Sequence, residues 1–260
     1  MGEIGTNRNG RSRRKSVGLR VIVISNIRTI ALLTGLLCVA GVTFFVADRD
    51  WWFSEYEGAD QSGMQNIGAK RQSFLWKEAI ATVFWVGEQP SPDNAEISNQ
   101  ASAWDPNWTE HFGGVDDPDN RCNYKPCSFK PMENPFYVAL PYDDLDENRK
   151  RKRRRLPWKT SHSTQSVLKN KWVAVQINER TCYGQWQDVG PFETDDYAYV
   201  FGAAAQPVNT RGEKAGIDVS PAIRDCLQMT GVAAVMWRLV HDYDVPPGPW
   251  KQLVTLRPGP

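Results

Sequence analysis

The sequence predicts a mainly β chain in which a six-stranded closed barrel follows a single N-terminal membrane-spanning helix. The 260 residues include 11 Trp, 17 Pro and 20 Gly, a composition that favours short strands and turns over long helices. Six short apolar runs lie between residues 81 and 240, and one uncharged run of 19 residues precedes them. With 41% hydrophobic and 23% charged residues, the composition excludes collagen, a coiled coil and wholesale disorder.

The uncharged run at residues 29–47 is expected to span an inner or plasma membrane. At about 1.5 Å per residue its length matches the hydrocarbon core of a bilayer, and it lacks the polar face of a buried soluble helix. Residues 1–28 hold seven basic residues and one acid, so the positive-inside rule places them in the cytoplasm and residues 48–260 in the periplasm or outside the cell. A cleaved signal peptide is the alternative, but cleavage after Ala47 would put the large side chain of Phe45 where a small one is needed.

Beyond this helix the sequence divides into a polar tether at 48–75, a barrel domain at 76–250 and a tail at 251–260. The predicted strands span 81–86, 136–140, 172–177, 182–189, 217–219 and 233–240. One or two short helices are expected among them. The clearest begins at Pro221 with Ser220 as N-cap and ends at Gly231 as C-cap.

Two long insertions interrupt the predicted strands. Residues 89–131 are either a functional cover for a cleft or a loop held by a disulfide. Residues 143–170 contain seven consecutive basic residues, 149–155, which form either a solvated run or a patch for polyanions. On the outer side of a membrane such polyanions would be envelope polymers or lipid head groups, and no nucleic acid partner is expected.

Four cysteines follow the predicted membrane helix, namely Cys122, Cys127, Cys182 and Cys226. An even number in an oxidising compartment favours two disulfides, for which three pairings are possible. Zinc bound by Cys122, Cys127 and His111 is the alternative, although the spacing is looser than that of common zinc sites. We therefore expect no metal and no cofactor.

Four segments carry a resemblance to a known family. Residues 187–192 read QDVGPF and residues 216–223 read GIDVSPAI, while ATVFWVGE at 81–88 and FYVALPY at 136–142 precede them. In this order and spacing the segments resemble the double-psi β-barrel family, which includes rare-lipoprotein-A-like proteins, expansins, barwin-like proteins and family 45 endoglucanases. The resemblance covers about residues 78–240 in scattered pieces.

This resemblance implies a pseudo-symmetric double-psi barrel with a glycan-binding groove and two catalytic residues, Asp188 and Asp218. Asp188 matches the acid of the Asp-x-Gly-Pro-Phe motif, and Asp218 matches the proton donor of the endoglucanases and of one type of membrane-bound lytic transglycosylase. The chain departs from the rare-lipoprotein-A-like pattern at Tyr137, where that group has a functional His.

The chemistry of carboxyl groups favours the same catalytic role for Asp188 and Asp218 without reference to the resemblance. Glycosidic bond cleavage requires a carboxylic acid that remains protonated near neutral pH, and burial beside a second carboxylate raises a pKa in that direction. A hydrolase uses both groups, whereas a lytic transglycosylase can use one. The alternative is structural, with Asp188 bonded to turn amides and Asp218 to first-turn donors of the following helix.

The candidate substrate-binding residues are those whose side chains suit a sugar and whose positions flank the motifs: Glu88, Trp85, Tyr137, Trp104, Trp108, Asp105 and His111. Flat aromatic faces suit the C–H surfaces of pyranose rings, although a tryptophan on a strand can equally belong to the core. The functional prediction is a membrane-anchored lytic transglycosylase-like enzyme acting on envelope polysaccharide, with peptidoglycan favoured. A non-catalytic glycan-binding module and polyanion binding through 149–155 are the alternatives.

Overall fold

The computed structural model describes residues 74–92, 95, 97–159 and 162–258. The predicted cytoplasmic segment, the predicted membrane helix and nearly all of the predicted tether lie outside these residues. Within the described part of the chain, every helix is too short or too polar to cross a bilayer.

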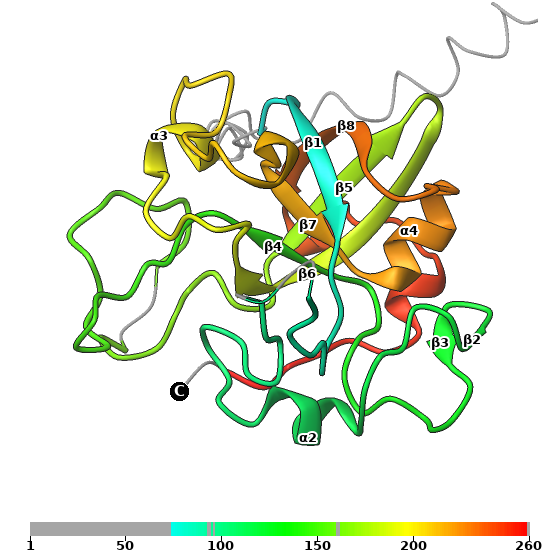
Figure 1. Cartoon of the computed structure of the whole chain (residues 1–260). Coiled ribbons are helices and arrows are strands. Elements are labelled where there is room, and N and C mark those ends of the chain that lie inside the picture. The colour runs from blue at the N-terminus through cyan, green and yellow to red at the C-terminus, as the bar shows by residue number, and fades with distance from the viewer. Residues whose placement is uncertain (1–73, 93–94, 96, 160–161, 259–260) are drawn as a thin grey trace, which may run out of the picture. The chain divides into compact units, whose positions relative to one another are not determined.

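Six strands close into a barrel, as predicted. In chain order they are β1 (Lys77–Val83), β4 (Tyr137–Leu140), β5 (Trp172–Ile177), β6 (Arg180–Val189), β7 (Ile217–Val219) and β8 (Ala233–Val240). Around the barrel the order is β1-β7-β4-β6-β5-β8, and Figure 1 shows β1 and β7 crossing in front of the other strands.

The strand order contains an internal two-fold relation. Strands β1 and β7 pair in parallel, as do β4 and β6, while the four remaining pairings are antiparallel. Exchanging β1 with β6, β4 with β7 and β5 with β8 reproduces the same ring with the same strand directions. The axis of this relation passes between β4 and β7, which places these two strands at the centre of one barrel wall.

The bounds of β5, β7 and β8 are as predicted, β4 begins one residue later and β6 two residues earlier, and β1 differs most, because it also ends at Val83 and not at residue 86. It begins at Lys77 instead of Ala81 because its first five residues pair with β8 even though they are not uniformly apolar. From Ala81 to Val83 the same strand pairs in parallel with β7. One strand therefore serves two partners, and its start follows from pairing, not from hydrophobicity.

Helix α4 (Pro221–Leu227) packs against β6. Ser220 is the N-cap, as predicted, and its hydroxyl accepts a hydrogen bond from the backbone N–H of Ile223 at 3.3 Å. The predicted C-cap at Gly231 is wrong: the helix ends at Leu227, and the C-cap is Gln228, which adopts a left-handed conformation (φ 58°) and donates its N–H to the carbonyls of the last turn. Gly184 on β6 allows this close packing, because a Cβ there would lie 2.5 Å from Cδ1 of Ile223.

The two disulfides confirm the prediction from the cysteine count and settle the pairing. Cys182 on β6 is bonded to Cys226 on α4, and Cys122 is bonded to Cys127. The second bond closes the small hairpin of β2 (Arg121–Cys122) and β3 (Lys125–Pro126). Zinc binding by Cys122 and Cys127 is thereby excluded, since neither retains a thiolate.

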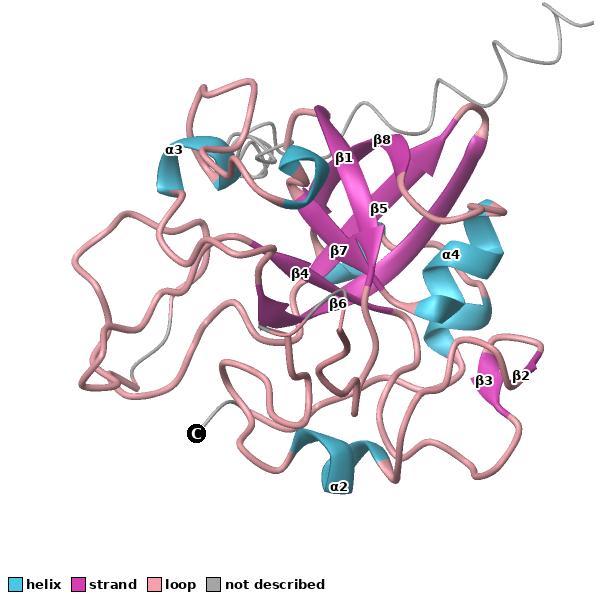
Figure 2. Ribbon diagram, viewed as in Figure 1, coloured by secondary structure: helices cyan, strands magenta, loops and turns pink. Residues whose placement is uncertain are grey.

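Short elements that the periodicity did not predict lie in the first insertion and in loops later in the chain (Figure 2). Residues 89–131 hold α2 (Trp108–Phe112) and the β2–β3 hairpin, and α3 (Tyr197–Val200) follows β6. The 3₁₀ turns in the described part of the chain lie at Gly212–Lys214, Asp242–Asp244 and Pro249–Lys251. Residues 143–170 extend to the side of the barrel that carries α3, at the left of Figure 1.

Candidate functional site

The two candidate acids lie in one row of residues across four neighbouring strands. Thr82 on β1 pairs with Asp218 on β7, Asp218 pairs with Ala139 on β4, and Ala139 pairs with Asp188 on β6. Adjacent strands are about 4.8 Å apart, so the two acids stand roughly 10 Å apart at the backbone with only the methyl group of Ala139 between them. The fold thus brings the two aspartates together.

A bulge aligns Asp188 with this row. Val138 pairs with Trp186 and the next residue, Ala139, pairs with Asp188, so β6 carries one extra residue, Gln187, at this point. Bulges commonly re-aim a side chain beside a functional site.

The row forms the floor of a cleft of about 470 Å³. The insertion contributes Ile97, Ser98 and Asn99 to the cleft lining, and the segments 189–192 and 211–212 contribute further lining residues. Asp188, Asp218 and Glu88 are the acids among the described residues that line it. The insertion is therefore a wall of the cleft as well as a loop held by a disulfide.

Asp218 is partly exposed to the cleft. Its Oδ1 accepts a hydrogen bond from the hydroxyl of Thr82, and a Cβ placed on Gly190 would lie 3.5 Å from its Oδ2. The glycine therefore leaves room beside this oxygen. Burial raises the pKa of Asp218 to about 7, the charges of Asp188 and Glu88 add to the rise, and the Thr82 hydrogen bond opposes it.

Asp188 is held more tightly. It is 8% exposed, and its Oδ1 accepts hydrogen bonds from the backbone N–H groups of Ala103 (2.7 Å) and Val189 (2.8 Å). Burial raises the pKa of Asp188 to about 7, although both hydrogen bonds favour its ionised form. The expected bonds to backbone amides are thus present, and the side chain still lines the cleft.

Glu88 is the candidate substrate contact that the structure places in the cleft. The amide of Asn99 donates a hydrogen bond to Glu88 Oε2 at 2.6 Å, and two backbone hydrogen bonds join Gly87 and Glu88 to the same asparagine. Glu88 therefore both lines the site and fixes the insertion wall.

The aromatic candidates lie elsewhere. Tyr137, Trp104 and Trp108 are 0–1% exposed, which leaves none of their ring faces available to a sugar in this structure. Tyr137 donates its hydroxyl hydrogen to Asp116 Oδ2 at 2.8 Å and accepts from the N–H of Val86, so it anchors the insertion. Trp85 is partly buried and is not among the residues lining the cleft.

Asp105 and His111 form a pair outside the cleft lining. His111 Nδ1 lies 2.8 Å from both carboxylate oxygens of Asp105, and Lys169 Nζ lies 3.5 Å from one of them. Burial alone would raise the pKa of Asp105, but the His111 hydrogen bond and the Lys169 charge outweigh it, so this pKa is lowered. The pair joins α2 to the loop before it.

Thr82, Arg211 and Phe192 are among the cleft residues that were not predicted from the sequence. The guanidinium of Arg211 lies 4.5 Å from the centroid of the Phe192 ring. Phe192 is the last residue of the QDVGPF motif, so this motif could have predicted an aromatic side chain in the cleft. No local sequence pattern indicated the other two residues. Closure of the barrel brings Thr82 on β1 to the cleft, and the loop before β7 brings Arg211 there.

The raised pKa of Asp188 predicts a gain in stability on substitution. A group whose pKa rises from about 3.9 to about 7 on folding favours the folded state below pH 4 and loses that contribution as the pH rises through 7. Asp188→Asn keeps an oxygen for both backbone donors but cannot ionise. We expect the variant to be more stable than the unsubstituted chain by about 2 to 4 kcal/mol at pH 8, and equally stable at pH 4.

Urea unfolding of the full chain in a non-ionic detergent at both pH values measures this difference. Asp119→Asn, at an exposed loop position, is the matched control and should change neither value. Equal stability of Asp188→Asn and the unsubstituted chain at pH 8 would contradict the prediction.

No family model matches the chain, and no curated protein sequence matches it. Among solved structures, the chain is similar to a Streptomyces papain inhibitor (SPI) at 14% sequence identity. The match covers 64% of this chain and 96% of that protein, with a TM-score of 0.27.

Proposed function

We propose that the chain is a membrane-anchored, outward-facing enzyme that cleaves peptidoglycan in the manner of a lytic transglycosylase. The single observation that carries this proposal is Asp218, a carboxyl group with a pKa near 7 on the floor of an open cleft, with Asp188 beside it in the same row. An acid with this pKa is partly protonated at neutral pH, which is the state that a general acid requires.

In the proposed reaction, Asp218 donates its proton to the glycosidic oxygen as the bond from C1 to that oxygen breaks. The resulting carboxylate then accepts a proton from a hydroxyl group of the same sugar, whose oxygen bonds to C1 and closes an internal ring. Asp218 thereby returns to its starting protonated form, because the proton of the sugar hydroxyl replaces the one that it gave, and no water is consumed. Asp188, when ionised, stabilises the positive charge that develops at C1.

The topology supports a double-psi barrel as the finer fold class. Two parallel strand pairs related by an internal two-fold axis are expected of that pseudo-symmetric barrel. The two sequence motifs of the resemblance meet beside this axis, since Asp218 and Asp188 pair with Ala139 from its two sides. The buried Tyr137 occupies the position of the family's functional His, so the proposed chemistry rests on the aspartates alone.

An exported location fits the rest of the chain. The two disulfides are typical of an oxidising compartment, and the basic and apolar segments at 1–28 and 29–47 are typical of a single-pass anchor with a cytoplasmic N-terminus.

The test is product analysis with purified peptidoglycan and the full chain in a non-ionic detergent. We expect released fragments that are one water lighter than hydrolysis products and carry an internal ring at the cleaved end. A double variant, Asp188→Asn with Asp218→Asn, should release none, whereas the control Asp119→Asn should match the unsubstituted chain. Fragments carrying an added water would replace the transglycosylase proposal with hydrolysis, and release by the double variant would refute both.

A second candidate function is a non-catalytic glycan-binding module. The observation that favours it is the tight hold of two backbone amides on Asp188 Oδ1, which suits a structural carboxylate. Such a module would sediment with insoluble peptidoglycan and release no fragments. Sedimentation without release would select this function, and release would exclude it.

A further inference from the structure

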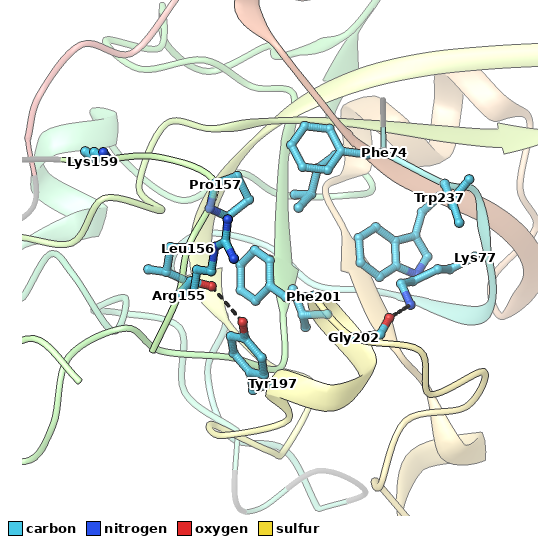
Figure 3. Close-up of a pocket in the computed structure, with 13 residues that line it drawn as sticks. Phe74, Lys77, Arg155, Leu156, Pro157, Lys159, Tyr197, Phe201, Gly202 and Trp237 are labelled. Carbon is cyan, nitrogen blue, oxygen red and sulfur yellow. Dashed lines mark hydrogen bonds between the residues drawn. The ribbon is translucent and has the colours of Figure 1, made fainter. Parts of the chain in front are cut away.

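A second pocket, separate from the cleft, lies between the basic loop and α3 (Figure 3). We define the basic loop as residues 149–159, which hold eight basic residues and no acid. The pocket has a volume of about 540 Å³, within the usual range for small-molecule sites. It shares no lining residue with the cleft.

The pocket combines an apolar floor with cations at its edge. Phe74, Leu156, Phe201 and Leu239 supply the floor together with the ring of Trp237, whose N–H is already bonded to Tyr199. The charged residues lining it are Lys77, Arg155 and Lys159, and no acid is found among the described residues of the lining. The occupant that complements this lining is an anion with an apolar part attached.

The basic loop is fixed against α3 by three contacts. The hydroxyl of Tyr197 donates to the carbonyl of Arg155 at 2.6 Å, and the Arg154 guanidinium lies 5.4 Å from the same ring. Lys152 forms an ion pair with Asp195 at 2.9 Å. The cations at the pocket edge are thus presented by an ordered loop, which lowers the entropy cost of binding.

Lys77 lies on the opposite wall. Its ammonium group donates to the carbonyl of Gly202 at 2.9 Å, as Figure 3 shows, and to the carbonyl of Ala204 at 3.4 Å. Burial lowers the pKa of Lys77, and the charge of Asp196 opposes this only in part. The carboxylate of Asp196 accepts backbone hydrogen bonds from Tyr199 and Val208, so it is committed to the loop around α3. An anion in the pocket would offset the cost of burying the Lys77 charge.

We propose that this pocket binds the phosphate head group of an anionic membrane phospholipid, with the adjoining part of an acyl chain on the apolar floor. Leu75 also lines the pocket and is 81% exposed, so it adds solvent-exposed apolar surface to the site. Only 26 residues separate Phe74 from the predicted membrane span in the sequence, so a lipid surface is the polyanion that we expect nearest to this pocket. This gives the basic run a role independent of the proposed glycan cleavage.

The test is isothermal titration calorimetry of the full chain in a non-ionic detergent with three probes. These are dihexanoyl phosphatidylglycerol, dihexanoyl phosphatidylcholine and inorganic phosphate. We expect phosphatidylglycerol to bind at least about tenfold more tightly than either of the others, because only this probe supplies both a net negative charge and an apolar chain. Equal affinity for phosphatidylcholine or for phosphate would overturn the proposal, as would the absence of binding.

Variants separate the pocket from general charge. Arg155→Gln with Lys159→Gln should weaken phosphatidylglycerol binding at least about tenfold. The control double variant, Lys150→Gln with Arg153→Gln, also removes two positive charges from the basic loop, but at residues that do not line the pocket. It should leave the affinity for phosphatidylglycerol within about twofold of that of the unsubstituted chain. Leu156→Ser should weaken binding of the lipid but not of inorganic phosphate. Equal losses of phosphatidylglycerol affinity in the two double variants would overturn the proposal. Peptidoglycan cleavage should be unchanged in both double variants and in Leu156→Ser.

Discussion

Asp218→Asn is expected to lower kcat for peptidoglycan cleavage by about a thousandfold with little change in KM, since general acid catalysis contributes about 10² to 10⁴ in rate. The amide has the shape of the carboxyl group and can still accept the hydrogen bond from Thr82. It has no acidic proton for the leaving oxygen. The loss therefore falls on the transition state, where the proton moves, and not on substrate binding.

The pH dependence of the unsubstituted chain follows from the same group. Because the protonated form of Asp218 is the active one and its pKa is about 7, kcat should fall as the pH rises above 7. Asp188 and Asp218 influence each other, so the apparent pKa of the profile belongs to the pair. Fragment release measured by chromatography from pH 5 to pH 9 gives the profile.

Asp188→Asn is the matched comparison within the same row. Its amide oxygen can still accept from Ala103 and Val189, so the cleft wall is retained while the charge is lost. We expect a fall in kcat of about tenfold to a hundredfold, smaller than that of Asp218→Asn. Equal losses in the two variants, or a rate above about a tenth of normal in Asp218→Asn, would contradict the assigned roles.

The strands could be predicted from the sequence because each is a short apolar run bounded by turn residues. The runs at 172–177, 217–219 and 233–240 match β5, β7 and β8 to the residue. The beginning of β1 could not be predicted, because Lys77 and Glu78 are held in a strand by pairing with β8. Helices α2 and α3 have five and four residues, too few to show helical periodicity.

The acids of the site could be proposed from motifs, but their surroundings could not. Asp188 and Asp218 meet because β4 lies between β6 and β7, and this order is a property of barrel closure that no local pattern records. The same closure brings Thr82 to Asp218 across 136 residues of sequence. The buried state of Trp104 and Trp108 could not be predicted either, because an aromatic residue in a long loop can lie on the surface or pack beneath it.

Trp186→Ala is expected to destabilise the folded domain by about 3 to 5 kcal/mol, the usual cost of removing a large buried aromatic side chain. Trp186 is fully buried on β6, its ring centroid lies 5.7 Å from that of Trp104, and its N–H donates to the carbonyl of Asp188 at 2.7 Å. Urea unfolding of the full chain measures the loss. Trp85→Ala, at a partly exposed position, should cost less, and equal losses would contradict the expectation.

The same substitution should also disturb the cleft, which links packing to the proposed chemistry. Trp104 follows Ala103, whose N–H donates to Asp188 Oδ1, so the packing of the two tryptophan rings fixes the distance between the insertion and β6. Trp186→Phe retains a ring for this packing but loses the hydrogen bond to Asp188, and should cost about 1 to 2 kcal/mol. If Trp186→Phe keeps normal cleavage while Trp186→Ala, assayed below its unfolding temperature, loses it, then ring packing and not the indole hydrogen bond positions Asp188. The reverse result, a loss in Trp186→Phe as large as that in Trp186→Ala, would assign the positioning to the hydrogen bond.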